Sequence, residues 1–215
     1  MTWTSEAAEH AKRVFPESCG LLIKIDGEEQ YWECKNISPK PEEIFIIDPD
    51  DWVEAEDISD EVVAVVHSHP KGSADPSDSD KESCERFNWP FYIFSVEKDE
   101  WHYLEPENYI VCPRLKESTN TDPKLRTIRV YGRLAREIGW KTLHADVTNT
   151  TSVLAFLNVN WPNIPYSDIS QYYQIQIGEE YINDKLLDLE VEGEIRIVPI
   201  VSGSWFLVAI EAIKT

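Results

Sequence analysis

The apolar positions of this chain fall into two blocks, which a polar stretch at residues 114–124 separates. In the first block, the β-branched run over residues 62–66 predicts a buried strand, and residues 20–25 predict another. Prolines flank a Ser-Thr-Asn-Thr core in the polar stretch, which is typical of a linker. We therefore predict a first domain over residues 1–113, a linker over 114–124 and a second domain over 125–215.

Two helices are predicted in the first block. Ser5 is the expected N-cap of the first helix. Its inner face is predicted to consist of four apolar side chains: Ala8, Ala11, Val14 and Phe15. Because Pro16 ends this helix, Glu17 is expected at a stiff junction between helix and strand. The second helix is expected over residues 77–87, after a loop that contains glycine and proline.

The second block predicts a small domain with one helix. Period-two alternation predicts four strands, at residues 125–132, 142–147, 172–178 and 194–200. The first two are expected to form a hairpin. Thr150 or Thr151 is expected to cap a short helix that contains residues 153–157 and that Pro162 ends. Hairpin, helix, strand and final strand follow one another in the β-grasp, or ubiquitin-like, order. The predicted fold class is therefore α/β (α+β), with a mixed sheet flanked by helices and a small β-grasp domain behind it.

The candidate chemistry lies at the end of the strand over residues 62–66. His67 and His69 are two apart, so they share one face of that strand, and Asp80 lies in the first turn of the next helix. Two imidazoles and one carboxylate leave a zinc ion one open position for water. Glu17 is a further carboxylate that can act as general base on that water.

Two less specific interpretations stay open at this point. The histidines could be ordinary hydrogen-bonded residues at a strand end. Ser77 and Asp80 also match a capping box, which is compatible with metal binding because one helical turn can carry both.

The pattern H-x-H-P-x(6)-S-x-x-D, with Glu17 upstream, resembles the JAMM (JAB or MPN+) family of metallopeptidases. The resemblance covers the first half of the chain and implies a Zn²⁺ ion held by His67, His69 and Asp80. It implies hydrolysis of a peptide or isopeptide bond, with Glu17 as the base and the hydroxyl of Ser77 as a donor to the oxyanion. Ser68 is expected to serve packing or hydrogen bonding, without a catalytic role.

The second block resembles a different family. Its opening, Leu-Arg-Thr-Ile-Arg-Val-Tyr-Gly-Arg-Leu, and its ending, Ile-Arg-Ile-Val-Pro-Ile-Val-Ser-Gly, are similar to the ubiquitin-like tail assembly protein I family of lambda-like phages. Small β-grasp sulfur carriers have a similar ending. The JAMM-like part resembles the tail assembly protein K family of the same phages, so the chain resembles a fusion of both modules. It departs from the protein K pattern because no NlpC/P60 cysteine peptidase domain follows, so a cell-wall-cleaving role is not carried over.

These resemblances imply a phage tail assembly or tail-tip protein with a hydrolase domain. Other phage tail proteins are the expected partners, and a ubiquitin-like segment is a possible type of substrate. We expect the host cytoplasm during assembly, and the virion tail tip, as locations. One alternative is a structural docking module whose metal site is not needed for hydrolysis. Another is a bacterial deubiquitinase-like or carrier-processing enzyme, which the absence of a terminal Gly-Gly pair disfavours.

Charge and cysteine content narrow the classes further. The net charge is −20, and residues 1–125 carry 12 Lys/Arg against 29 Asp/Glu. Such acidity argues against nucleic-acid binding, and it serves either solubility or the docking of a basic partner. No apolar run reaches the length of a membrane span, and the N-terminus lacks signal-peptide features. Four scattered cysteines indicate reduced thiols, and Cys19 near Glu17 is read as a small buried residue.

The end of the chain permits two interpretations. Residues 205–213 are too apolar to lie freely in water, so they are expected to pack on their own domain or on a neighbouring subunit. Alternatively, Gly203 corresponds to the terminal glycine of a carrier protein. A JAMM site would then cut the bond between Gly203 and Ser204.

Overall fold

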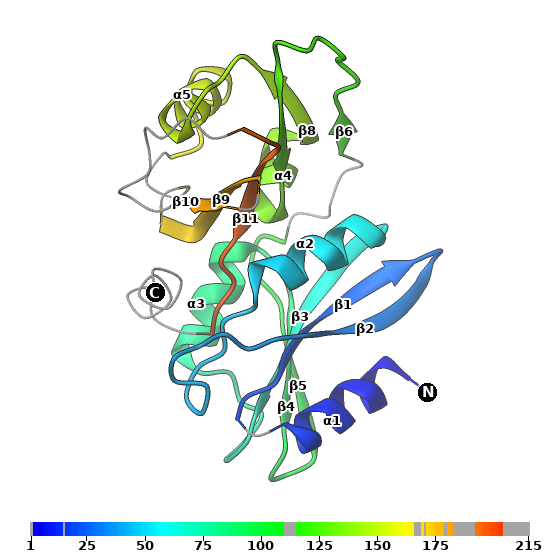
Figure 1. Cartoon of the computed structure of the whole chain (residues 1–215). Coiled ribbons are helices and arrows are strands. Elements are labelled where there is room, and N and C mark those ends of the chain that lie inside the picture. Colours follow the sequence, from blue (N-terminus) through cyan, green and yellow to red (C-terminus); the bar gives the residue numbers. More distant parts are fainter. Residues whose placement is uncertain are drawn as a thin grey trace. The chain divides into compact units, whose positions relative to one another are not determined.

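The structure, a computed structural model, describes residues 2–14, 16–109, 115–165, 169, 171–178, 180–182 and 192–203. These residues form two compact units (Figure 1). Unit 1 draws its described residues from Met1–Val111 and Ile200–Thr215, and unit 2 draws them from Cys112–Pro199. The expected apolar packing of residues 205–213 lies outside the described residues.

Unit 1 is built on one five-stranded sheet with the order β2-β1-β3-β4-β5. Its elements are α1 (Trp3–Arg13), β1 (Cys19–Ile25), β2 (Glu28–Cys34), α2 (Pro49–Ile58), β3 (Glu61–His69), α3 (Asp78–Phe87), β4 (Phe91–Ser95) and β5 (Glu100–Leu104). Neighbouring strands are antiparallel except β3 and β4, which are parallel and joined through α3. This crossover brings the start of α3 to the end of β3, as the sequence predicted.

Helix α1 covers one face of this sheet, where Ala7 packs with Leu22 and Ala64. Its N-cap is Thr2 rather than the predicted Ser5, because the Thr2 side chain accepts the hydrogen bond from the Ser5 amide. The buried face also differs from the prediction. Its buried residues are Ala7, His10 and Ala11, whereas Ala8 is only half-buried and Phe15 lies outside the described residues.

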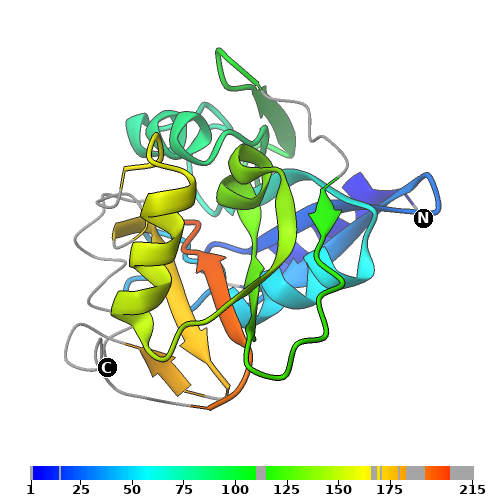
Figure 2. The same cartoon turned by 90° about the horizontal axis from the view of Figure 1, so that it is seen from above.

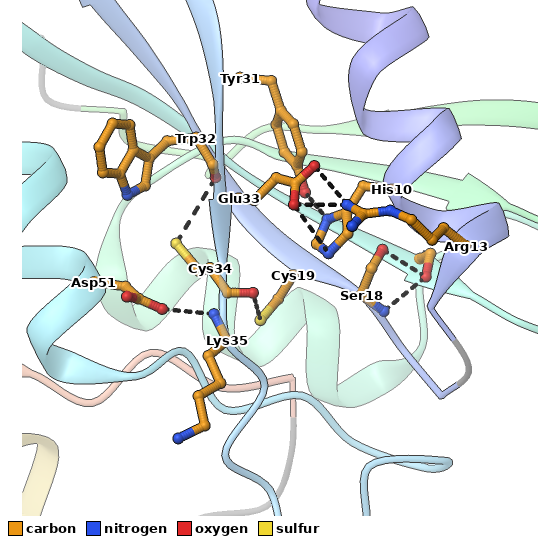
Figure 3. Close-up of polar contacts among 11 residues, drawn as sticks. His10, Arg13, Ser18, Cys19, Tyr31, Trp32, Glu33, Cys34, Lys35 and Asp51 are labelled. Atoms are coloured by element: carbon orange, nitrogen blue, oxygen red, sulfur yellow. Dashed lines mark hydrogen bonds and ion pairs between the residues drawn. The ribbon is translucent and has the colours of Figure 1, made fainter.

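Polar contacts fix α1 against β2 (Figure 3). His10 Nδ1 lies 2.8 Å from the hydroxyl of Tyr31, and the guanidinium of Arg13 binds both carboxylate oxygens of Glu33. Gly20 leaves room for the Tyr31 side chain, because a Cβ atom at position 20 would lie 2.5 Å from the Tyr31 hydroxyl. This cluster holds α1 in place.

Helices α2 and α3 lie on the opposite face of the sheet (Figure 1). The Trp52 side chain of α2 is fully buried and meets Trp89 edge to face, with ring centroids 5.3 Å apart. Trp89 in turn donates a hydrogen bond to the carbonyl of Val62 on β3. Such burial of large aromatic side chains supports the strand that carries the two histidines.

Unit 2 contains a mixed sheet with the order β10-β9-β11-β7-β8-β6. Its elements are β6 (Lys116–Glu117), β7 (Arg126–Val130), α4 (Gly132–Ile138), β8 (Trp140–Ala145), α5 (Thr150–Asn160), β9 (Tyr173–Ile177), β10 (Glu180–Ile182) and β11 (Ile195–Pro199). The last strand, β11, is central and runs parallel to β7, the first long one. Helix α5 packs its buried Val153, Leu154 and Leu157 onto the apolar face of this sheet (Figure 2).

Three features of unit 2 differ from the sequence-based prediction. Strands β7 and β8 pair antiparallel as expected, but α4 connects them instead of a hairpin turn. Strand β6 lies within the predicted linker of residues 114–124 and pairs with β8. The described residues after β11, 200–203, group with unit 1 instead of with the predicted second domain.

Candidate metal centre

Three side chains from two elements of unit 1 form a compact cluster of possible metal ligands. His67 and His69 lie at the end of β3, and Asp80 lies in the first turn of α3. One ligand atom from each of these residues falls within 4.8 Å of the others. His67 Nε2 is 3.2 Å from Asp80 Oδ1, and His69 Nε2 is 3.4 Å from Asp80 Oδ2.

These spacings are close to those between zinc ligands, and they run to the two different oxygens of Asp80. Bonds of about 2.1 Å to a tetrahedral ion place neighbouring ligand atoms roughly 3.4 Å apart. His69 Nδ1 lies 3.0 Å from the carbonyl oxygen of Ser73, to which it can only donate, so in the neutral ring the lone pair is on Nε2, the nitrogen that faces Asp80. His67 is 2% exposed, its Nδ1 has no hydrogen-bond partner among the described residues, and its Nε2 lies beside the carboxylate of Asp80. A bound cation would satisfy one of these buried atoms.

Asp80 is fixed by a capping box at the start of α3. Its Oδ2 accepts hydrogen bonds from the backbone nitrogen of Ser77, at 2.8 Å, and from the Ser77 hydroxyl, at 2.6 Å. Burial favours the neutral acid, but the nearby His67 and the hydrogen bond from Ser77 hold the pKa of Asp80 well below its usual range. The carboxylate is therefore an anion that is ready to act as a ligand. The capping box predicted from sequence is confirmed.

Glu17 lies in the turn between α1 and β1 and lines the same site. Its backbone is held on both sides, because its nitrogen donates to the carbonyl of Pro41 and its own carbonyl accepts from the amide of Asn36. Burial raises the pKa of Glu17, and the charges of His67 and His69 act in the opposite direction. A raised pKa suits a carboxylate that takes up and releases a proton near neutral pH.

A cavity of about 410 Å³ opens beside Glu17 and His69. Its other lining residues are Glu42, Glu43, Pro70 and Lys71. Glu17 and His69 therefore face a space large enough for part of an extended peptide.

Several contacts that position this site could not be located from the sequence. The hydroxyl of Ser68 accepts hydrogen bonds from both the nitrogen and the hydroxyl of Ser18, the residue after Glu17 (Figure 3 shows the Ser18 side of this contact). The ring of Phe45 stacks on His67 with centroids 4.5 Å apart. These contacts join residues far apart in the chain, so no local sequence signal reveals them. Ser68 contributes the hydrogen bonding predicted for it.

The cysteines near the site are not activated. Cys19 and Cys34 face each other across β1 and β2, and both are buried (Figure 3). Burial raises the pKa of each thiol well above its usual range, with nearby acidic groups adding to the effect. The thiolate form is therefore disfavoured, which agrees with the prediction of a buried structural Cys19.

Comparison with known proteins adds to this picture. Residues 2–106 match the family described as prokaryotic homologs of the JAB domain, so this part of the chain is similar to a JAB domain. The resemblance predicted for the first half of the chain is confirmed.

One curated relative is the tail tip assembly protein K of Escherichia phage N15, which is 37% identical over 98 residues. The alignment covers 45% of this chain and 40% of that protein, so the similarity extends over less than half of either. Among the helices that the structure describes, none is both long and apolar enough to cross a membrane.

Proposed function

We propose that unit 1 is a zinc-dependent peptidase or isopeptidase of the JAMM type. The observation that carries this proposal is the cluster of His67, His69 and Asp80, whose spacing suits a tetrahedral ion. Two neutral imidazoles and one carboxylate form the open, three-ligand type of zinc site that is used in hydrolysis.

Each side chain then has a distinct task. A zinc ion held by His67, His69 and Asp80 would supply Lewis acidity for the attack of water on an amide carbonyl. Glu17 takes the proton from the water on its carboxylate and passes it to the departing amine, and its fixed backbone keeps it aimed at the site. Ser77 holds Asp80 and is the proposed donor to the oxyanion. A hydroxyl has one proton to donate, so Ser77 must break its hydrogen bond to Asp80 Oδ2 before it can donate to the oxyanion.

We infer further that the chain acts in phage tail assembly, where other tail proteins are its partners. The similarity to the tail tip assembly protein K supports this inference. The sheet of unit 2, with its last strand central and parallel to its first long strand, supports the ubiquitin-like assignment of that unit. The amide bond that is cut then belongs to a tail protein or to a ubiquitin-like segment. The host cytoplasm during assembly and the virion tail tip are the proposed locations.

Metal analysis tests the ligand set. Protein purified without chelator is expected to carry one zinc ion per chain, and zinc is expected to raise its thermal midpoint. Asp80→Asn should lose both effects. Asp78→Asn is the matched control, because Asp78 lies on the same turn but its side chain is 93% exposed. Stoichiometric zinc in the Asp80→Asn protein would show that the ligand assignment is wrong.

A second test separates chemistry from metal binding. Glu17→Gln is expected to keep zinc and fold while cleavage of co-expressed tail proteins falls by about 10²–10⁴-fold. Glu9→Gln is the control, since Glu9 is an exposed carboxylate on α1 that does not line this cavity. Mass spectrometry of the tail proteins and plaque formation by a phage carrying each variant are the readouts. If Glu17→Gln supports normal tails and normal processing, the site acts as a structural docking module.

A further inference from the structure

The chain itself supplies a segment that lies along the candidate metal centre. Residues 200–203 follow β11 directly and run antiparallel to residues 45–47 in unit 1. Ile47 donates its backbone N–H to the carbonyl of Val201, and Gly203 donates its own to the carbonyl of Phe45. This pair of backbone bonds is the way in which an extended peptide adds to a strand edge.

Side-chain burial accompanies these backbone bonds. Ile200 packs in an apolar cluster with Ile46, and Val201 and Ser202 are also buried. Residues 200–203 therefore have the burial of a docked peptide rather than that of an exposed tail.

Gly203 reaches the centre itself. A Cβ atom at this position would lie 2.5 Å from Cε1 of Phe45 and 3.1 Å from Oδ1 of Asp80. Phe45 is fully buried and stacks on His67, so its ring cannot yield without disturbing a proposed ligand. Only glycine lets the backbone pass between the aromatic ring and the carboxylate at this distance.

We propose that residues 200–203 occupy the substrate path of their own JAB domain, and that the peptide bond after Gly203 is a substrate of this site. This inference rests on the proposed function. Water adds to the carbonyl carbon of Gly203, and the bond to the nitrogen of Ser204 breaks. Glu17 moves a proton from the water to that nitrogen, so the products are a carboxylate at Gly203 and an amine at Ser204.

Docking can be measured without activity, in the metal-free protein. Hydrogen exchange at the amides of Ile47 and Gly203, followed by NMR, is expected to be slow because both are hydrogen-bonded. Gly203→Ala should speed exchange at Ile47 by about tenfold or more, since the added methyl group overlaps Phe45. Val159→Ala is the control, because the Val159 side chain on α5 is 78% exposed. Fast exchange at Ile47 in the unaltered protein would overturn the proposal.

Cleavage is measured after zinc is added to the full chain. Intact-mass spectrometry is expected to show a chain that ends at Gly203, at a rate independent of protein concentration. Gly203→Ala and Glu17→Gln should both stay full-length. When a tagged Glu17→Gln chain is mixed with the unaltered protein, the tagged chain should remain intact, because the segment docks within its own molecule.

The outcomes separate this inference from the proposed function. A zinc-loaded chain that cuts tail proteins yet itself ends at Thr215 overturns the self-substrate and leaves the hydrolase intact. Cleavage of the tagged Glu17→Gln chain overturns the intramolecular path. If neither the chain nor any tail protein is cut while Ile47 remains protected, the proposed hydrolase fails, and the self-substrate fails with it.

Discussion

At the scale of single residues, Asn36 links the candidate base to the chain that borders the site. Its amide nitrogen donates to the carbonyl of Glu17 at 2.9 Å, and its oxygen accepts from the backbone nitrogens of Ser38 and Ile46. Ile46 is the residue that faces Ser202. One side chain therefore ties the position of Glu17 to the segment, residues 45–47, along which residues 200–203 lie.

This arrangement predicts a loss of hydrolysis in Asn36→Asp. The acceptor oxygen is retained, but a carboxylate oxygen then faces the carbonyl of Glu17 where a donor had been. A lost hydrogen bond of this kind costs about 1–3 kcal/mol, so the rate should fall by roughly tenfold or more. Zinc content should not change. Asn120→Asp is the control, because the Asn120 oxygen only accepts from the backbone of Asp122 in a turn. An unchanged rate in Asn36→Asp would show that Glu17 keeps its position without this bond.

The residues of the candidate site were easier to locate from the sequence than the contacts that support them. His67, His69 and Asp80 could be identified because their spacing is short and each lies at the end of a predicted element. Asn36 starts a local turn through Ser38, which a sequence can suggest. Its bond to Glu17 spans 19 positions and depends on how the loops pack, so sequence alone could not show it.

At the scale of elements, the start of α3 combines a helix cap with a candidate ligand. Ser77 is the N-cap, and its hydroxyl both accepts from the backbone of Asp80 and donates to its carboxylate. The geometry of the ligand and the stability of the helix start are therefore coupled.

We predict that Ser77→Ala weakens both properties. Loss of the cap should lower the free energy of unfolding by about 1 kcal/mol, measured in urea. Loss of the donor that orients Asp80 should lower zinc affinity by about 10–100-fold, measured against a competing chelator. Ser77→Thr should restore both, since it keeps the hydroxyl. If Ser77→Ala binds zinc normally but hydrolyses slowly, the hydroxyl serves the oxyanion instead of Asp80.

The strength of the apolar pattern decided which elements could be predicted. Strands β1, β3, β7, β9 and β11 have apolar runs or alternation, and the sequence located all five. Strands β6 and β10 have only two and three residues, and pairing with β8 and β9 defines them. Helix α4 is seven residues long and begins at Gly132, which has a φ of +71°, so nothing in the local sequence indicates a helix start.

At the scale of the whole molecule, the chain leaves unit 1, builds unit 2 and returns to unit 1 at residues 200–203. A division at the polar stretch could be read from composition. The return of residues 200–203 to unit 1 could not be predicted from the sequence. It depends on backbone hydrogen bonds to residues 45–47, which lie more than 150 positions earlier in the chain. If the chain is cut between the units, the C-terminal fragment therefore still carries residues 200–203, which dock on the N-terminal fragment.

This return predicts that the two halves stay together after the chain is cut between them. A site-specific protease sequence introduced at residues 110–114 should give two fragments that co-elute in size-exclusion chromatography of the metal-free protein. Val201→Asp should separate them, because it places a carboxylate where the side chain is fully buried beside Ile47. Val159→Asp is the matched control, since Val159 is 78% exposed. Fragments that separate without any substitution would contradict a stable return of residues 200–203. Co-elution that survives Val201→Asp would mean that other contacts hold the halves together.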